Sequence, residues 1–242
     1  DDHPFDNTLH IQPLKTESRT IVHYGVPAEN SIESPDYFVK RAFPSTPERK
    51  IEFLTVDPAS PQVLVGTANM DLMILSRELS GDEIQQVDEF LKQGGVALLS
   101  LNDQSSTHSL KSLLSLSKEQ DTATEIEPAE VNGYALLTNI DFEHKLFQMF
   151  QAPEYSDFTN LKFWRYQKLS LPDSLSHQVL ARFDHKDPAL VSITRGAGRL
   201  IVSTFGWTPQ ESQFALSTKF VPIMNAILNL KTEFNASRTQ FL

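Results

Sequence analysis

The chain has 242 residues, of which 40% are hydrophobic and 21% are charged, a balance within the ordinary range of globular domains. Its 21 basic and 31 acidic residues give a formal net charge of −10, and Lys and Arg are scattered singly, so we expect no nucleic-acid partner. The absence of cysteine excludes disulfides, thiol catalysis and the usual zinc-finger and iron–sulfur ligand sets.

The chain ends carry no recognisable targeting segment. The first residues, Asp1-Asp2-His3-Pro4, are neither a signal peptide nor a start methionine, and we expect the chain to be cut from a longer one. No apolar run approaches the roughly 18 to 20 residues that a membrane helix needs, so we expect any membrane segment to lie outside this chain. We predict a polar arm at 1–18, one folded domain at 19–230 and a tail at 231–242.

Four short apolar runs in the first half are typical of strands that are buried on both faces of a parallel sheet. They are Thr20–Tyr24, Ile51–Val56, Leu72–Leu75 and Val96–Leu101. Helical stretches lie between them. This alternation predicts parallel strands with right-handed crossovers, and hence a doubly wound, three-layer α/β domain.

The clearest helix lies between the third and fourth of these strands. Its apolar residues recur at helical spacing, and Ser80 with Glu83 forms a Ser-x-x-Glu capping box at its start. Gly94 supplies a residue that can take positive φ where the helix stops. A shorter helix is predicted to begin after Ser34-Pro35 and to end before Pro44.

The second half of the chain predicts antiparallel additions to the sheet. Asn132-Gly133 suits a type I′ hairpin turn, and we expect it to join strands at 122–131 and 134–139. A second antiparallel series is expected at 179–183, 189–195 and 200–205. The last helix is expected at about 216–230, where Pro222 indicates that it starts late or bends.

Several segments resemble the class I glutamine amidotransferase-like superfamily. In Met73–Leu101 an apolar strand, an amphipathic helix and the pair Gly94-Gly95 lead into a second apolar strand, as in the core of that fold. Other segments are similar to one branch of the superfamily, the extracytoplasmic part of bacterial membrane proteins with a BatA-type N-terminal segment: Asp2–Thr8, Pro188–Val191, Gly196–Arg199, Ser203–Trp207 and Leu216–Pro222. The resemblance implies a mostly parallel, flavodoxin-like sheet with antiparallel additions.

The resemblance also implies where an active amidotransferase would carry its nucleophile. That place is the turn after Val96–Leu101, where the family has a Gly-x-Cys-x-Gly elbow and this chain has Leu99-Ser100-Leu101-Asn102-Asp103. Both the cysteine and the glycines that allow the sharp, strained turn are missing from the sequence. Glutamine hydrolysis by the family mechanism is therefore excluded, and we expect neither a cofactor nor a metal.

Open α/β sheets bind ligands at the carboxyl ends of their parallel strands. We therefore expect a remaining ligand site, or a degenerate elbow, to be formed by Gly25, Ser76, Ser100, Asn102 and Asp103. Ser100 or Ser105 with His108 as base is an alternative nucleophile, but a catalytic serine needs a positioned imidazole and a third group to orient it. We interpret this stretch as a polar loop at a strand end.

Other polar clusters have simpler interpretations. The seven histidines show no pairing at metal-ligand spacing within one element, and Asp184, His185 and Asp187 fit a hairpin turn. Glu125 and Glu127 share one face of a predicted strand, which we interpret as a solvated face.

Aromatic residues beside an arginine are the strongest sequence signal for a contact surface. Trp164, Arg165 and Trp207 are the candidates, although core packing explains many such aromatics. We expect a non-catalytic ectodomain on the extracytoplasmic (periplasmic) face of a bacterial membrane, where it binds a protein partner in an envelope complex. A hydrolase with a non-cysteine site at the carboxyl ends of the parallel strands, or a carbohydrate-binding domain, is the alternative.

Overall fold

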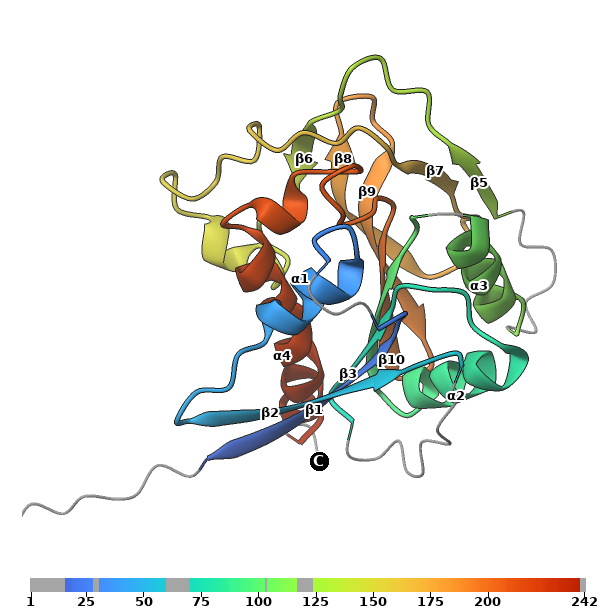
Figure 1. Cartoon of the computed structure of the whole chain (residues 1–242), viewed down its shortest axis with the longest axis vertical. Helices are drawn as coiled ribbons and strands as arrows, with labels where there is room; N and C mark the ends of the chain where they lie inside the picture. The colour runs from blue at the N-terminus through green and yellow to red at the C-terminus, as the bar shows by residue number, and fades with distance from the viewer. Residues whose placement is uncertain (1–15, 28–30, 60–69, 103, 117–123, 240–242) are drawn as a thin grey trace, which may run out of the picture.

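The computed structural model describes residues 16–27, 31–59, 70–102, 104–116 and 124–239. An eight-stranded sheet lies at its centre, in the order β2-β1-β3-β4-β10-β9-β8-β6 (Figure 1). The strands from β2 to β10 run parallel, and β9, β8 and β6 continue the sheet antiparallel. Their bounds are β1 (Glu17–Tyr24), β2 (Arg49–Val56), β3 (Leu72–Leu75), β4 (Val96–Ser100), β6 (Leu137–Ile140), β8 (His177–Phe183), β9 (Pro188–Arg195) and β10 (Gly198–Ser203).

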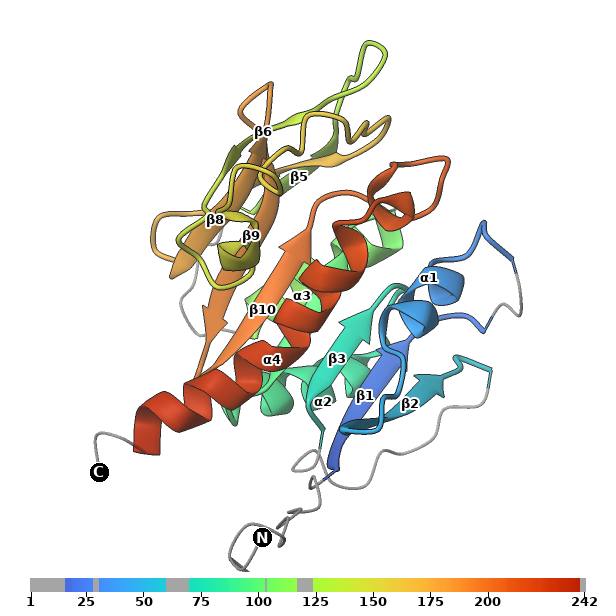
Figure 2. The ribbon, with the colours of Figure 1, turned by 90° about the vertical axis from the view of Figure 1, so that its left-hand side faces the viewer.

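Helices cover both faces of this sheet. One face, here called the α4 face, carries α1 (Pro35–Ala42) and α4 (Phe220–Thr239), and the other, the α2 face, carries α2 (Gly81–Lys92) and α3 (Gln104–Ser115) (Figure 2). Two short 3₁₀ helices, η3 (Gln148–Phe150) and η4 (Phe214–Leu216), lie near the start of α4. The predicted three-layer α/β fold with antiparallel additions is confirmed.

Alternation along the buried strands divides the core into two halves. On β1, Ile21 packs on the α4 face, whereas Val22 and Tyr24 pack on the α2 face, and all three side chains are fully buried. A strand that is buried on both faces has no solvent-facing positions for polar residues, which is why the sequence shows continuous apolar runs. His23 departs from this apolar pattern, because it is polar and yet fully buried.

The start of α2 has the predicted capping box. The hydroxyl oxygen of Ser80 accepts the Glu83 N–H at 3.4 Å, and the Glu83 carboxylate accepts the Ser80 N–H at 2.8 Å. Arg77 then donates to both carboxylate oxygens of Glu83, at 2.6 and 2.9 Å. These bonds fix the loop that follows β3 against the first turn of α2.

The predicted hairpin around Asn132-Gly133 is wrong in its pairing. Gly133 does take a positive φ of 88°, as the turn chemistry requires. However, β5 (Glu125–Pro128) pairs with β7 (Gln167–Ser170) in a separate two-stranded sheet, and β6 pairs with β8. The strands on either side of the turn thus find partners far away in the sequence.

The boundaries at the chain ends differ from the expected ones. The predicted arm lies almost wholly outside the described residues, and β1 already begins at Glu17. The last helix continues to Thr239, so the residues 231–239 belong to α4 and do not form a separate tail. Pro222 lies in the first turn of α4, where its missing N–H has no helical partner to lose. Within the described ranges, no helix combines the length and the apolar character needed to span a membrane.

Candidate functional site

The chain order of the sheet reverses direction between β1 and β3. From β1 the chain crosses to β2 on one side, and it then returns to β3 on the other side of β1. The carboxyl ends of β1 and β3 therefore form a topological switch point, which is where open α/β sheets bind their ligands. Gly25 and Ser76, two of the predicted site residues, directly follow these two strands.

Three polar side chains form a continuous hydrogen-bonded chain at this switch point. His23 Nε2 lies 2.6 Å from Ser76 Oγ, and His23 Nδ1 lies 3.1 Å from Asp36 Oδ1. His23 is fully buried, Asp36 is 2% exposed, and Ser76 is partly exposed. We call these residues the His23 triad. Their connectivity and distances are those of a serine nucleophile, a general base and the carboxylate that orients the base.

The surroundings of the triad fix its protonation. Burial would by itself raise the pKa of Asp36, but the hydrogen bonds and charges of His23 and Lys40 together lower it, so Asp36 is ionised. Burial lowers the pKa of His23 below 6.5, although Asp36 opposes this shift. An ionised carboxylate only accepts hydrogen bonds, so Nδ1 of the neutral imidazole donates to Asp36. Nε2 then accepts the hydroxyl hydrogen of Ser76, which is the tautomer that general-base catalysis requires.

Local sequence explains how each member reaches its place. Ser34 caps α1 by accepting the N–H of Asp36 at 3.3 Å, and Pro35 begins the helix, so the carboxylate lies in the first turn, where the helix dipole favours a negative charge. Gly25 leaves room for the imidazole, because a Cβ at this position would lie 2.2 Å from Cε1 of His23. The ring is hydrogen-bonded at both nitrogens, so it could move aside only by breaking these bonds.

At the predicted elbow, Ser100 has a structural role. Ser100 is 2% exposed, and its hydroxyl donates to the Phe205 carbonyl at 3.1 Å, which leaves it neither accessible nor next to a base. The strand-to-helix turn that the family uses is present, since β4 leads into α3, but Asp103 lies outside the described residues. Asn102 lies at this edge, and its Oδ1 is buried without a hydrogen-bond partner in the described part of the chain. His108 is exposed on α3, and the side chain of Ser105 lies outside the described set.

The predicted contact surface is contradicted at Trp207. This side chain is 1% exposed and packs against Phe220 with ring centroids 6.3 Å apart, because the chain turns inward beneath α4 after β10. Trp164 is half-buried and Arg165 is exposed, so only these two reach solvent. The described residues contain no group of three or more His, Asp or Glu side chains that could hold a metal ion.

Two other interpretations of polar clusters are supported. Asp184–Pro188 forms a turn between β8 and β9 in which the Lys186 N–H donates to the Phe183 carbonyl at 2.9 Å. Lys186 takes a positive φ of 69° there. Glu125 and Glu127 are both exposed on β5, as expected for a solvated strand face.

Comparison with known proteins supports the fold. No protein-family model matches the sequence, and no curated protein matches it either. Among solved structures, the chain is similar to a cytoplasmic protein from Salmonella typhimurium, with a TM-score of 0.60 and 13% identity, over 88% of this chain and 98% of that one. It is also similar to a ThuA-like protein from Parabacteroides merdae, with a TM-score of 0.60 and 10% identity, over 90% of this chain and 91% of that one.

A third similar structure is longer. A beta-galactosidase from Rahnella matches 91% of this chain with 32% of its own length, with a TM-score of 0.54 and 11% identity. ThuA-like proteins have the class I glutamine amidotransferase-like fold, and this chain has that α/β fold too. At such low identities the likeness concerns the fold alone.

Ser76 and Gly25 could be predicted from the sequence, whereas their partners His23 and Asp36 were not. His23 interrupts the apolar run Ile21–Tyr24, and alternation places it on the same face as Ile21. A histidine in a strand buried on both faces needs hydrogen-bond partners, and this was the available signal. Nothing in the spacing pointed to Asp36, because it comes from a separate helix.

Proposed function

We propose that this domain is a serine hydrolase of small carboxylic esters, with the His23 triad as its catalytic group. One observation carries the proposal: the hydrogen-bonded chain from Ser76 Oγ through His23 to Asp36, at 2.6 and 3.1 Å, located at the switch point of the sheet. This is the alternative raised from the sequence, a non-cysteine site at the carboxyl ends of the parallel strands. In place of the missing elbow cysteine, it uses a serine that directly follows the neighbouring strand β3.

The chemistry would use the triad in two half-reactions. Ser76 Oγ attacks the ester carbonyl carbon while its proton passes to His23 Nε2, and Asp36 stabilises the imidazolium that forms. Collapse of the tetrahedral adduct breaks the bond to the leaving oxygen, which takes the proton from His23. The acyl group is then on Ser76. Water, deprotonated by His23, attacks this acyl group, and collapse releases the carboxylate and returns the proton to Ser76.

Lys40 supports the geometry of this triad. Its Nζ lies 3.1 Å from Oδ2 of Asp36, which leaves Oδ1 for the imidazole. Lys40 also counters part of the negative charge of Asp36, and its charge contributes to the lowered pKa of His23. A base with a lowered pKa stays neutral and ready to accept a proton under mildly acidic conditions.

Covalent labelling tests this proposal directly. A fluorophosphonate probe phosphonylates an activated serine with loss of fluoride, and we expect one labelled residue, Ser76, by peptide mass spectrometry. Ser76→Ala should abolish labelling, and His23→Gln should slow it about 100-fold or more. Ser100→Ala is the matched control. Ser100 ends β4 at the same edge of the sheet, but it is buried and its hydroxyl donates to the Phe205 carbonyl. An unlabelled wild-type protein, or labelling that persists in Ser76→Ala, would overturn the proposal.

A second candidate function is the expected protein-binding ectodomain of a membrane-anchored, BatA-type bacterial protein. Four exposed apolar side chains favour a protein contact: Met149, Tyr155, Leu216 and Val221, which are 43 to 62% exposed. They lie around Lys219, whose ammonium group contacts the Tyr155 carbonyl and the rings of Phe150 and Phe158. We call these four residues the Lys219 patch, and we place the predicted envelope partner on it.

Crosslinking in a bacterial envelope fraction tests this second candidate. The wild-type chain should repeatedly capture the same membrane-associated protein, and Leu216→Glu should lose it, because a charge in the middle of an apolar contact is costly. Ile32→Glu is the control, since Ile32 is 55% exposed outside the patch. Capture that is equal for Leu216→Glu and wild type would argue against the patch. Active-site labelling is scored separately, so each function can fail alone.

A further inference from the structure

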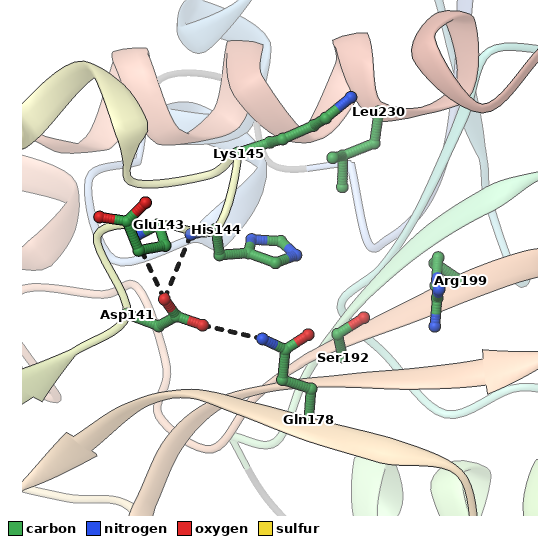
Figure 3. Close-up of a pocket in the computed structure, with 8 residues that line it drawn as sticks. All are labelled: Asp141, Glu143, His144, Lys145, Gln178, Ser192, Arg199 and Leu230. Carbon is green, nitrogen blue, oxygen red and sulfur yellow. Dashed lines mark hydrogen bonds between the residues drawn. The ribbon is translucent and has the colours of Figure 1, made fainter. Parts of the chain in front are cut away.

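A polar pocket of about 330 Å³ lies on the α4 face of the sheet, next to the starts of β8 and β10 (Figure 3). We call it the α4 pocket. The residues of its lining that matter below are Asp141, His144, Gln178, Ser192 and Leu230, which come from the segment after β6, from β8, from β9 and from α4. Its volume is at the lower end of the usual range of small-molecule sites, which favours a ligand of about the size of a monosaccharide.

Two polar residues form the floor of the α4 pocket, beside positions that are apolar. Gln178 on β8 and Ser192 on β9 lie directly opposite each other in the antiparallel register. Farther along these two strands, Leu180 and Leu190 pack into the apolar core of the α4 face. Ser192 is only 4% exposed, so its hydroxyl is withdrawn from bulk water like a core group. A buried hydroxyl is costly unless it has a hydrogen-bond partner.

One wall of the α4 pocket is held by Asp141. Its Oδ1 accepts the N–H groups of Glu143 and His144 at 3.1 and 3.2 Å, and its Oδ2 accepts the side-chain amide of Gln178 at 2.8 Å. The backbone N–H of Asp141 donates to the Leu180 carbonyl at 2.9 Å. The loop and the Gln178 amide are therefore tied together before any ligand binds, which lowers the entropy cost of binding.

Three hydrogen-bonding groups of the pocket have no partner among the residues that the structure describes. Nδ1 of His144 accepts the Leu146 N–H at 3.3 Å, so the neutral ring carries its hydrogen on Nε2, which points into the pocket (Figure 3). Burial lowers the pKa of His144 below 6.5, which keeps the ring neutral at neutral pH. The Ser192 hydroxyl points into the same space, and the amide oxygen of Gln178 is turned away from Asp141 (Figure 3). The pocket thus offers one donor, one acceptor and one hydroxyl that can do both.

The charged groups of the lining are engaged with the protein itself. The Arg199 guanidinium donates to the Thr194 hydroxyl, and both Arg199 and Lys145 take part in further interactions within the chain. The Asp141 carboxylate is occupied by the three hydrogen bonds described above. A charged ligand would therefore compete with these existing partners, whereas a neutral ligand can bind the three free groups without displacing any of them.

We propose that the α4 pocket binds a small neutral compound with several hydroxyl groups, of the size of a monosaccharide. A hydroxyl group both donates and accepts, so the hydroxyls of such a ligand can accept from the Nε2–H of His144, donate to the amide oxygen of Gln178 and do either with Ser192. Leu230 provides an apolar contact for the C–H groups of the ligand. The site is separate from the His23 triad and does not depend on the proposed hydrolase activity.

Saturation-transfer NMR and titration calorimetry on the full chain test the site with defined probes. Glucose and galactose are neutral and carry several hydroxyl groups, and at least one of them should bind at millimolar concentration. Cyclohexanol, which keeps a sugar-sized ring but has a single hydroxyl, should not bind. Gluconate, which combines the hydroxyls with a charge, should bind more weakly than the sugar. Absence of binding for both sugars would overturn the proposal, and so would equal binding of cyclohexanol. Tighter binding of gluconate would overturn the choice of a neutral ligand.

Substitutions identify the groups that bind. Ser192→Ala should weaken sugar binding about five- to tenfold, because one or two hydrogen bonds are lost. Ser170→Ala is the matched control, since Ser170 is exposed on β7, outside the pocket. His144→Phe removes the Nε2–H donor while keeping an aromatic ring, and it should weaken binding by a similar factor. Gln178→Leu changes an exposed residue and should fold even if Ser192→Ala does not. Unchanged affinity in these pocket variants would overturn the assignment.

Discussion

The His23 triad and the α4 pocket are both polar groups on the same face of one sheet, but they use their hydrogen bonds differently. In the triad both nitrogens of His23 are bonded to protein atoms, and the imidazole has no contact with solvent. In the α4 pocket, the Ser192 hydroxyl and the His144 Nε2–H are directed into open space. The comparison teaches that the triad residues should contribute to folding stability, whereas the pocket residues should contribute to ligand affinity.

The largest effect is expected when the centre of the triad is removed. His23→Ala leaves the Asp36 carboxylate buried with Lys40 as its remaining side-chain partner, and it opens a cavity beside Phe53. We expect the free energy of unfolding to fall by about 3 kcal/mol or more, as when one partner of a buried pair is lost. Urea denaturation measures this. His144→Ala in the pocket should cost less than half as much, and equal losses would refute the comparison.

The pH dependence of stability should follow the buried imidazole. The pKa of His23 is lowered from 6.5 by burial, so between 6.5 and the folded-state pKa the unfolded chain binds a proton that the native chain does not. Stability therefore rises with pH in this window and is lost as the pH falls below 6.5, by up to ~1.4 kcal/mol per pH unit for one proton. Asp36, whose pKa is lowered from 3.8, loses its contribution only below that value.

His144 contributes with the same sign, because burial also lowers its pKa. Denaturation at a series of pH values should therefore be repeated with His144→Gln and with His23→Gln. We expect the slope below pH 6.5 to persist in His144→Gln, where the fully buried His23 remains. A slope that persists undiminished in His23→Gln would assign the dependence to other groups.

A smaller loss is expected when only the hydroxyl of the triad is removed. Ser76→Ala leaves Nε2 of His23 without its donor in a buried position. The cost of one unpaired buried acceptor is about 1 to 2 kcal/mol. A shift of the urea midpoint at an unchanged m-value measures this loss of stability. The same stability as wild type would mean that the imidazole is satisfied in another way and that the 2.6 Å bond adds nothing.

The smallest effect on stability is expected at the pocket serine. Ser192→Ala removes a hydroxyl that has no protein partner in the described part of the chain, so we expect the unfolding free energy to stay within about 0.5 kcal/mol. Affinity for a neutral sugar should fall in the same variant. A large loss of stability without a loss of affinity would show that Ser192 belongs to the core and not to a binding site.

Much of this fold could be predicted from the sequence, because local patterns encode it. The buried strands, the Ser80 capping box and the location of Ser76 at a strand end all depend on residues that are neighbours in the chain. The failed hairpin is instructive, since Gly133 has the expected positive φ while β5 and β6 pair with distant strands. Turn chemistry fixes a turn, but sheet pairing is decided by long-range packing.

The sites themselves depend on long-range contacts, which explains why sequence patterns found them only in part. Asp36 reaches His23 from the first turn of a helix, and Ser192 reaches the α4 pocket from β9, far along the chain from His144. Spacing rules describe ligands on one element and cannot detect such partners. Trp207 shows the converse, because a residue that looks like a surface aromatic is enclosed by a helix later in the chain.

The close approach of Gly25 to the imidazole has a consequence for how this sequence can vary. In a library randomised at every position and selected for folded protein, position 25 should return glycine alone while His23 is present, since any larger residue would overlap the ring. If position 23 is changed to a small residue, that restriction disappears. Positions 23 and 25 should therefore vary together, and a lineage that keeps one would retain the other for steric reasons, whatever chemistry the site performs.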